Sequence, residues 1–188
     1  AALGVELPAG SHAHVAFEDA RVVRALWPGS DGFDVVGPPA TVVSAADRLS
    51  AAGVQACGPD AYEALRIEAG VPRQGFDLDE KTIPQEAFLE LDAVSFSKGC
   101  FLGQELVCRI DTRGRVNRYL RRLTDIADEP PRGAEIVAGE KVVGTVTSSA
   151  STGALGYVRH EVEPPAEVEL RWDGHTARAR VEPIPTAA

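Results

Sequence analysis

The stretch AEVELRWDGHTARARVEPI, residues 166–184, decides the fold of the C-terminal part of the chain. Apolar and polar residues alternate on both sides of Asp173-Gly174, and an Asp-Gly pair suits the left-handed backbone angles of a type I′ turn. The stretch therefore predicts a β-hairpin. Similar short alternating segments precede it, separated by Gly, Pro and Asp: RYLRRLTDI, AEIVAGEKVVGTVTSSA and GALGYVRH. This even spacing predicts a small antiparallel β-barrel or sandwich after Asn117.

The N-terminal part of the chain has a mixed pattern. Residues 12–27 predict two short strands hinged near Glu18-Asp19, and residues 32–38 predict another. Residues 39–53 have apolar residues at helical spacing and end at a glycine, which predicts a helix, and residues 54–58 then predict a returning strand. The order strand, strand, helix, strand indicates an open sheet with a helix on one face.

The segments that follow complete the fold class. Residues 59–70 predict a second helix that ends at Gly70, and the polar residues 71–86 predict a long ordered loop. The expected class is α+β: a ferredoxin-like α/β subdomain over residues 1–116, followed by a small antiparallel C-terminal β-barrel over residues 117–188.

Composition narrows the classes of function. The 188-residue chain has a formal net charge of −9, which argues against nucleic-acid binding because phosphate neutralisation needs clustered Lys and Arg. No apolar run approaches the roughly 20 residues that span a bilayer, so no membrane partner is predicted. The three cysteines indicate a reducing, cytoplasmic setting rather than a disulfide framework. The chain contains no methionine and begins abruptly, which suggests a fragment of a longer protein.

Two groups of acidic residues are candidate ligands. Glu68, just ahead of the end of the second helix, is either a solvated surface carboxylate or a carboxylate that accepts a pair of hydrogen bonds from a planar ligand. Asp77, Asp79 and Glu80 could ligate a cation, but the EF-hand pattern is missing, so solvation or capping is expected and no metal is predicted.

The segment KGCFLGQELVCR, residues 98–109, combines a thiol with charged side chains and two glycines. The glycines permit a tight turn before a helix that starts at Gln104. A cysteine near a helix N-terminus and beside Lys98 would have a lowered pKa, so Cys100 is either a reactive thiol or a small buried hydrophobe. The other two cysteines, Cys57 and Cys108, are predicted to lie in the core.

A small basic cluster follows the helix. It consists of Arg118, Arg121 and Arg122 in an otherwise acidic chain. The cluster is either a solvated strand face or a patch for an anionic ligand tail.

Two motifs together resemble the YgfZ-type branch of the glycine-cleavage T-protein superfamily. The first is the branch signature K-G-C-aromatic-x-G-Q-E-x-x-x-R-x-x-x-x-G, which is met here by Lys98, Gly99, Cys100, Phe101, Gly103, Gln104, Glu105, Arg109 and Gly114. The second is R-x-E-A-G-x-P-x-x-G, found upstream from Arg66 to Gly75. Nine fixed positions within 17 residues make chance matching an unlikely explanation.

The resemblance implies a tetrahydrofolate-binding protein with a C-terminal β-barrel. It implies that Glu68 binds the pterin ring and that Arg118 lies near the carboxylate tail of the folate, with Gln104 and Arg109 as further cofactor-binding residues. Family members are longer, so residues 1–116 are expected to lack an N-terminal partner subdomain.

Three functions remain open at this point. The leading hypothesis is an accessory protein that supports iron–sulfur cluster assembly or repair, with iron–sulfur proteins as possible clients, Cys100 as the reactive residue and Lys98 as the group that activates it. The alternative is a folate-dependent aminomethyl or one-carbon transferase. The third is a non-catalytic interaction module in which Cys100 is structural.

Overall fold

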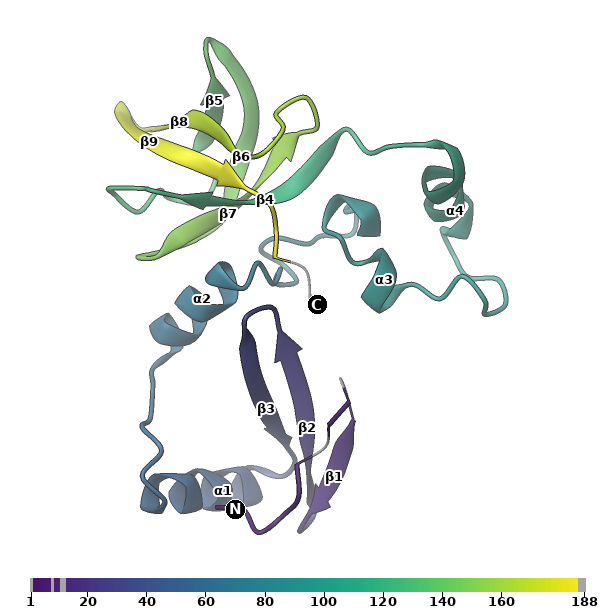
Figure 1. The fold of residues 1–188 in the computed structure, drawn as a ribbon, viewed down its shortest axis with the longest axis vertical. Coiled ribbons are helices and arrows are strands. Elements are labelled where there is room, and N and C mark those ends of the chain that lie inside the picture. Colours follow the sequence, from purple (N-terminus) through teal and green to yellow (C-terminus); the bar gives the residue numbers. More distant parts are fainter. Residues whose placement is uncertain (1, 8, 11–12, 186–188) are drawn as a thin grey trace. The chain divides into compact units, whose positions relative to one another are not determined.

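The computed structural model describes residues 2–7, 9–10 and 13–185. The chain divides into two compact units, Ala1–Tyr62 together with Pro185–Ala188, and Glu63–Ile184. Strands and helices occur in both units (Figure 1), which confirms the α+β class.

The first unit is built on an antiparallel sheet of three strands, β1 (His14–Phe17), β2 (Ala20–Trp27) and β3 (Ser30–Val36), in that order. The helix α1 (Pro39–Ala51) follows. Its Ala45 belongs to a buried apolar cluster with Phe17, Ala20 and Val22 of the sheet. The predicted strands and the predicted helix are thus present.

The predicted returning strand is absent. Residues 54–58 form no β-ladder, and all five are exposed. A strand is stabilised by cross-strand contacts and by burying one of its faces. These residues have neither, so the segment is an extended connection between two helices.

Helices and an ordered loop lead into the second unit. The helix α2 (Pro59–Glu68) is followed by the 3₁₀ turn η1 (Pro84–Glu86), the short helix α3 (Glu90–Ala93) and α4 (Gln104–Arg113). Among the described residues, no helix is long and apolar enough to cross a membrane. No group of His, Cys, Asp and Glu side chains in the described ranges could hold a metal ion.

The C-terminal part is a closed antiparallel barrel (Figure 1), which decides between the predicted barrel and sandwich. Its strands follow each other around the barrel in the order β4-β7-β6-β5-β8-β9. Their bounds are Arg118–Thr124 (β4), Glu135–Ala138 (β5), Lys141–Ala150 (β6), Gly153–Arg159 (β7), Ala166–Trp172 (β8) and His175–Glu182 (β9). The division of the chain into domains at residue 116 stays a prediction.

Local chemistry explains two features of the barrel. Asp173 and Gly174 join β8 to β9 with φ values of 44° and 79°, as the type I′ turn requires. Gly144 of β6 lies where the backbone of β7 approaches closely, because an added Cβ would be 2.0 Å from the carbonyl oxygen of Tyr157. Only glycine fits this position without a shift of the backbone.

The two faces of the barrel wall have separate apolar clusters. Ala154 and Val158 of β7 pack into the barrel core. Leu155 and Tyr157 alternate with them and therefore face outward, where they pack with Ile67 of α2 and Ala87. The second helix and the segment after η1 are thus held against the outside of the barrel.

Asp77 forms the polar connection between this outer layer and the barrel. Its Oδ2 accepts hydrogen bonds from Nη1 of Arg66 and from the backbone N–H of Arg73, both at 2.9 Å. Its Oδ1 accepts from the hydroxyls of Ser148, at 2.7 Å, and of Thr147. These hydroxyls lie at an irregularity in the β6–β7 ladder.

The expectation that Asp77 is solvated or caps a helix is therefore wrong. The residue is 3% exposed and its ion-pair partner Arg66 is 2% exposed. Asp79 does behave as expected: it is exposed and binds the backbone N–H of Lys81 and the hydroxyl of Thr82. The hydrogen bond from Thr82 is the main reason that the pKa of Asp79 is lowered.

We expect Asp77→Asn to lower the free energy of unfolding by about 3–5 kcal/mol, because it leaves the buried Arg66 guanidinium without its full counter-charge. Urea unfolding followed by circular dichroism measures the change. Asp79→Asn is the matched control from the exposed end of the same loop, and it should change stability little. Arg66 also donates through Nε and Nη2 to Oε2 of Glu63, at 3.1 and 2.8 Å. A loss no larger than that of the control would mean that Glu63 alone balances the charge of Arg66.

Candidate functional site

Glu68 lies at the end of α2, where the helix closes in a Schellman motif. The N–H of Gly70 donates to the carbonyl of Ile67 and the N–H of Val71 donates to the carbonyl of Arg66, both at 3.0 Å, with Gly70 at φ 69°. The carbonyl of Glu68 takes no part in this motif. It accepts a hydrogen bond of 2.9 Å from Nη1 of Arg122 on β4.

The carboxylate of Glu68 is exposed, and no hydrogen bond or ion pair to it is found among the described residues. The backbone at Glu68, in contrast, is held by the Schellman motif that follows it and by the hydrogen bond from Arg122. A carboxylate that is free at the end of a fixed backbone can accept two hydrogen bonds from a planar ligand.

The Cys100 segment forms a closed turn ahead of α4. Gly103 has φ 84°, which agrees with the predicted tight turn. The side-chain Oε1 of Gln104 accepts from the N–H of Phe101 at 3.2 Å, and the N–H of Gln104 donates to the carbonyl of Phe101 at 3.3 Å. Lys98 places its Nζ 5.1 Å from the centre of the Phe101 ring. The turn is therefore held together around Phe101.

All three cysteines are free and exposed. For Cys100, exposure argues against the alternative of a buried hydrophobe. The prediction that Cys57 and Cys108 lie in the core is wrong. Cys57 belongs to the connection between α1 and α2. Cys108 lies on α4, and among the residues of this helix whose burial is described only Val107 is buried.

Arg109 lines a cavity of about 480 Å³ next to α4. The cavity has an apolar part, formed by Ile83, Leu106, Ile110 and Val116, and a polar part, formed by Glu86, Arg109, Arg115 and Asn117, with Gly114 completing the wall. The helix is held beside η1 by Gln85, whose Nε2 donates to the carbonyl of Val107 at 3.0 Å. The cavity combines apolar surface with two guanidinium groups.

Arg118 forms a bidentate pair with Glu86 at the edge of this cavity. Its Nε and Nη2 donate to the two carboxylate oxygens at 3.0 and 3.1 Å. These hydrogen bonds raise the pKa of Arg118. The same guanidinium lies 4.4 Å from the centre of the Tyr157 ring, and burial raises the pKa of Tyr157 to about 12.

Sequence reasoning missed Glu86. The residue is 7% exposed, although it comes from a polar segment. Its only local signal is a capping interaction, in which it accepts from the N–H of Ile83 at 3.3 Å. Its pairing with Arg118, 32 residues away, is a tertiary contact that no local sequence pattern predicts.

The structure thus brings the predicted site residues together in three places. Lys98, Cys100 and Gln104 belong to the turn. Arg109 lines the cavity beside α4, and Arg118 is bound to Glu86, another residue of its lining. Glu68 is fixed to β4 by Arg122, which is four residues, or about 13 Å, along the strand from Arg118 and on the same face. Neither described cavity is lined by Glu68 or Cys100.

The remaining arginine of the predicted basic cluster, Arg121, packs against aromatic rings. Its guanidinium carbon is 4.9 Å from the centre of the Tyr119 ring and 5.3 Å from that of Phe88, and these two rings stack on each other. Burial lowers the pKa of Arg121.

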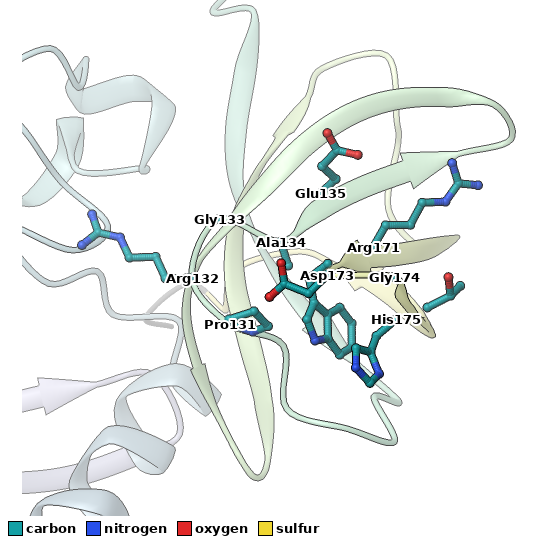
Figure 2. A pocket seen from close by; sticks show the side chains of 11 residues that line it. Pro131, Arg132, Gly133, Ala134, Glu135, Arg171, Asp173, Gly174 and His175 are labelled. Carbon is teal, nitrogen blue, oxygen red and sulfur yellow. The ribbon is translucent and has the colours of Figure 1, made fainter.

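A second cavity, of about 620 Å³, lies at the β8–β9 turn of the barrel (Figure 2). Trp172 and His175 stack there, with their ring centres 5.8 Å apart. Figure 2 shows Arg132 pointing away from His175. None of the residues predicted to form the site lines this cavity.

The chain matches two known domain families in succession. Residues 7–98 match the GCVT N-terminal domain, and residues 120–185 match the C-terminal β-barrel domain of CAF17. The chain is 33% identical over 173 residues to an aminomethyltransferase of Synechococcus elongatus, which covers 88% of this chain and 45% of that enzyme. It is 32% identical over 179 residues to an aminomethyltransferase of Thermus thermophilus, covering 92% of this chain and 49% of that enzyme.

A solved structure has the same fold. The crystal structure of glycine cleavage system aminomethyltransferase T from Bartonella henselae superimposes with a TM-score of 0.74 at 26% identity, covering 89% of this chain and 50% of that one. The chain therefore spans about half the length of the relatives it matches. The two domain matches and the similarity of the fold all indicate the same superfamily. The chain belongs to the glycine-cleavage T-protein superfamily, in its YgfZ/CAF17 branch.

Proposed function

We propose that the protein binds tetrahydrofolate and supports iron–sulfur cluster assembly or repair. The observation that carries the folate part is Glu68: an exposed carboxylate without a described partner, at a helix end whose backbone is fixed by the Schellman motif and by Arg122. The family signature supplies the expectation that this residue meets a pterin.

The chemistry of the pterin ring suits such a carboxylate. A pterin edge presents adjacent N–H donors, and a carboxylate offers two acceptor oxygens in one plane. Two parallel charge-assisted hydrogen bonds fix the orientation of the ring as well as its affinity. Because the carboxylate oxygens of Glu68 bind no described group, no internal contact has to be broken before the ligand binds.

The cavity beside α4 suits the other end of the ligand. Its volume of about 480 Å³ is within the usual range for small-molecule sites. The apolar side chains can contact an aromatic linker, and Arg109 and Arg115 can pair with carboxylates. Arg118 uses two of its N–H groups to hold Glu86, which lines the cavity, so its contribution is to fix Glu86 and to add positive charge beside the cavity.

Cys100 supplies the reactive group of the proposal. Its thiol is exposed on a turn that Gln104 closes, and this turn leads directly into α4, the helix that carries Arg109. A ligand between Glu68 and the α4 cavity would therefore lie near a thiol that solvent and client proteins can reach. The iron–sulfur role rests on this accessibility and on the branch signature.

Aminomethyl transfer is the second candidate function. It is favoured by the relatives named aminomethyltransferase, which match about nine-tenths of this chain. The two functions differ in what they require of the thiol, since a transferase of this kind would not depend on Cys100. Turnover of a one-carbon donor that survives Cys100→Ser would favour the transferase.

Glu68→Gln should weaken tetrahydrofolate binding by about 10- to 100-fold, because it replaces one charged acceptor oxygen by a donor that opposes the pterin N–H groups. Isothermal titration calorimetry on the longest natural form measures the change. Glu80→Gln, which removes an exposed carboxylate from the neighbouring loop, is the matched control and should bind like the unaltered protein. Equal affinities in all three proteins would remove Glu68 from the site.

Bound tetrahydrofolate should slow the alkylation of Cys100 by iodoacetamide severalfold, because a ligand that reaches from Glu68 to the cavity beside α4 would cover the turn that carries the thiol. The reaction is followed by mass spectrometry in a Cys57→Ser, Cys108→Ser background, which leaves a single thiol. Adding Glu68→Gln to this background should abolish the protection at the same ligand concentration. A rate that is indifferent to the ligand, in a protein that binds it, would separate Cys100 from the folate site.

A further inference from the structure

Arg122 makes a contact that the sequence gives no reason to expect. It lies on β4, 54 residues after Glu68, and its Nη1 donates to the backbone carbonyl of Glu68 at 2.9 Å. The last carbonyls of a helix lack partners within the helix. Here the Schellman motif satisfies those of Arg66 and Ile67, and Arg122 satisfies that of Glu68.

The charge of Arg122 strengthens this contact. The C-terminal end of a helix carries a partial negative charge, so a cation bound there is favourable. A hydrogen bond from a charged donor is also stronger than one between neutral groups. Arg122 therefore fixes the end of α2 to the barrel at the residue whose carboxylate is proposed to bind the pterin.

A second set of contacts also holds this helix end. The buried Arg66 donates through Nη1 to the carbonyl of Val71 at 2.7 Å and to Asp77, and Asp77 is bound to Ser148 on β6. The end of α2 is thus attached to two barrel strands, to β4 through Arg122 and to β6 through Arg66 and Asp77. Of the two, Arg122 is only partly buried and binds the residue itself, so it can be altered without opening the core.

We propose that Arg122 is a positioning residue: it sets the direction in which the Glu68 carboxylate meets a planar ligand, and it does not contact the ligand. The barrel then takes part in recognition by orienting a residue of α2. This inference rests on the proposed folate function. A direct contact between Arg122 and the carboxylate tail of the ligand is the competing explanation that the experiment must separate.

The affinities for two ligands separate these explanations. Tetrahydropterin has the ring that Glu68 would bind but lacks the anionic tail. If Arg122 acts through Glu68, Arg122→Ala should weaken the binding of tetrahydrofolate and of tetrahydropterin by the same factor, about tenfold. A loss confined to tetrahydrofolate would overturn the proposal in favour of direct contact with the tail.

Two variants make the comparison specific. Arg178→Ala removes an exposed barrel arginine for which no contact with α2 is described, and it should leave both affinities unchanged. Arg122→Lys should recover part of the lost affinity, since an ammonium group can still donate to the carbonyl. If Arg178→Ala lost as much affinity as Arg122→Ala, the loss would follow from the change in net charge alone, and the proposal would be overturned.

A double-mutant cycle tests whether Arg122 acts through Glu68. In a Glu68→Gln background the carboxylate is already gone, so Arg122→Ala should cause little further loss of affinity. Losses that simply add would show that the two residues act independently, and this would overturn the proposal. The midpoint of urea unfolding, measured for the same variants, shows whether any loss of affinity is a loss of folded protein.

Hydrogen exchange gives a readout that needs no ligand. The N–H groups of residues 69–71 donate within the helix end, so Arg122→Ala should speed their exchange several-fold while Arg178→Ala should not. Unchanged exchange overturns the positioning role whether or not tetrahydrofolate binds. If the unaltered protein binds neither ligand, the proposed function fails, and the exchange rates alone decide whether Arg122 holds the helix end.

Discussion

The buried ion pair between Arg66 and Asp77 is the constraint on which the second unit depends. Removing two charges from water is costly, and the cost is offset only where both are paired and fully hydrogen-bonded. Asp77 meets this condition through Arg66, the N–H of Arg73, and two hydroxyls of β6. This full set of hydrogen bonds can form only when the end of α2, the following loop and the barrel are all in place, so it couples their positions.

The two family motifs therefore contain residues that stabilise the fold as well as residues that are candidates for chemistry. In the element R-x-E-A-G, the arginine is buried and builds the fold, the glycine closes the helix at φ 69°, and the glutamate alone faces solvent. In the signature around Cys100, Gln104 closes the turn by binding Phe101. Arg66, Gly70 and Gln104 thus hold the backbone that carries Glu68 and Cys100.

The strand β4 organises the candidate site. Arg118, Leu120 and Arg122 alternate onto its outer face. Arg118 holds Glu86 at the cavity beside α4, Leu120 packs in the apolar cluster with Ile67, and Arg122 holds the end of α2. The notable result is that a sequence cluster of arginines, predicted to be a solvated face or an anion patch, is largely occupied with internal contacts that fix the surroundings of the site.

Local sequence determined those features that depend on a few neighbouring residues. The Asp-Gly turn, the helix ends at Gly53 and Gly70, and the alternating strands follow from backbone preferences, because each is decided within one turn or one strand. The signature residues likewise identified the family. Only the tertiary structure decided that residues 54–58 form no strand, that Asp77 is buried, and that Glu86 pairs with Arg118. These outcomes depend on partners 32 to 71 residues away, or on their absence, and the free energy of burying a charge or pairing a strand edge is set by such distant partners rather than by the local chain.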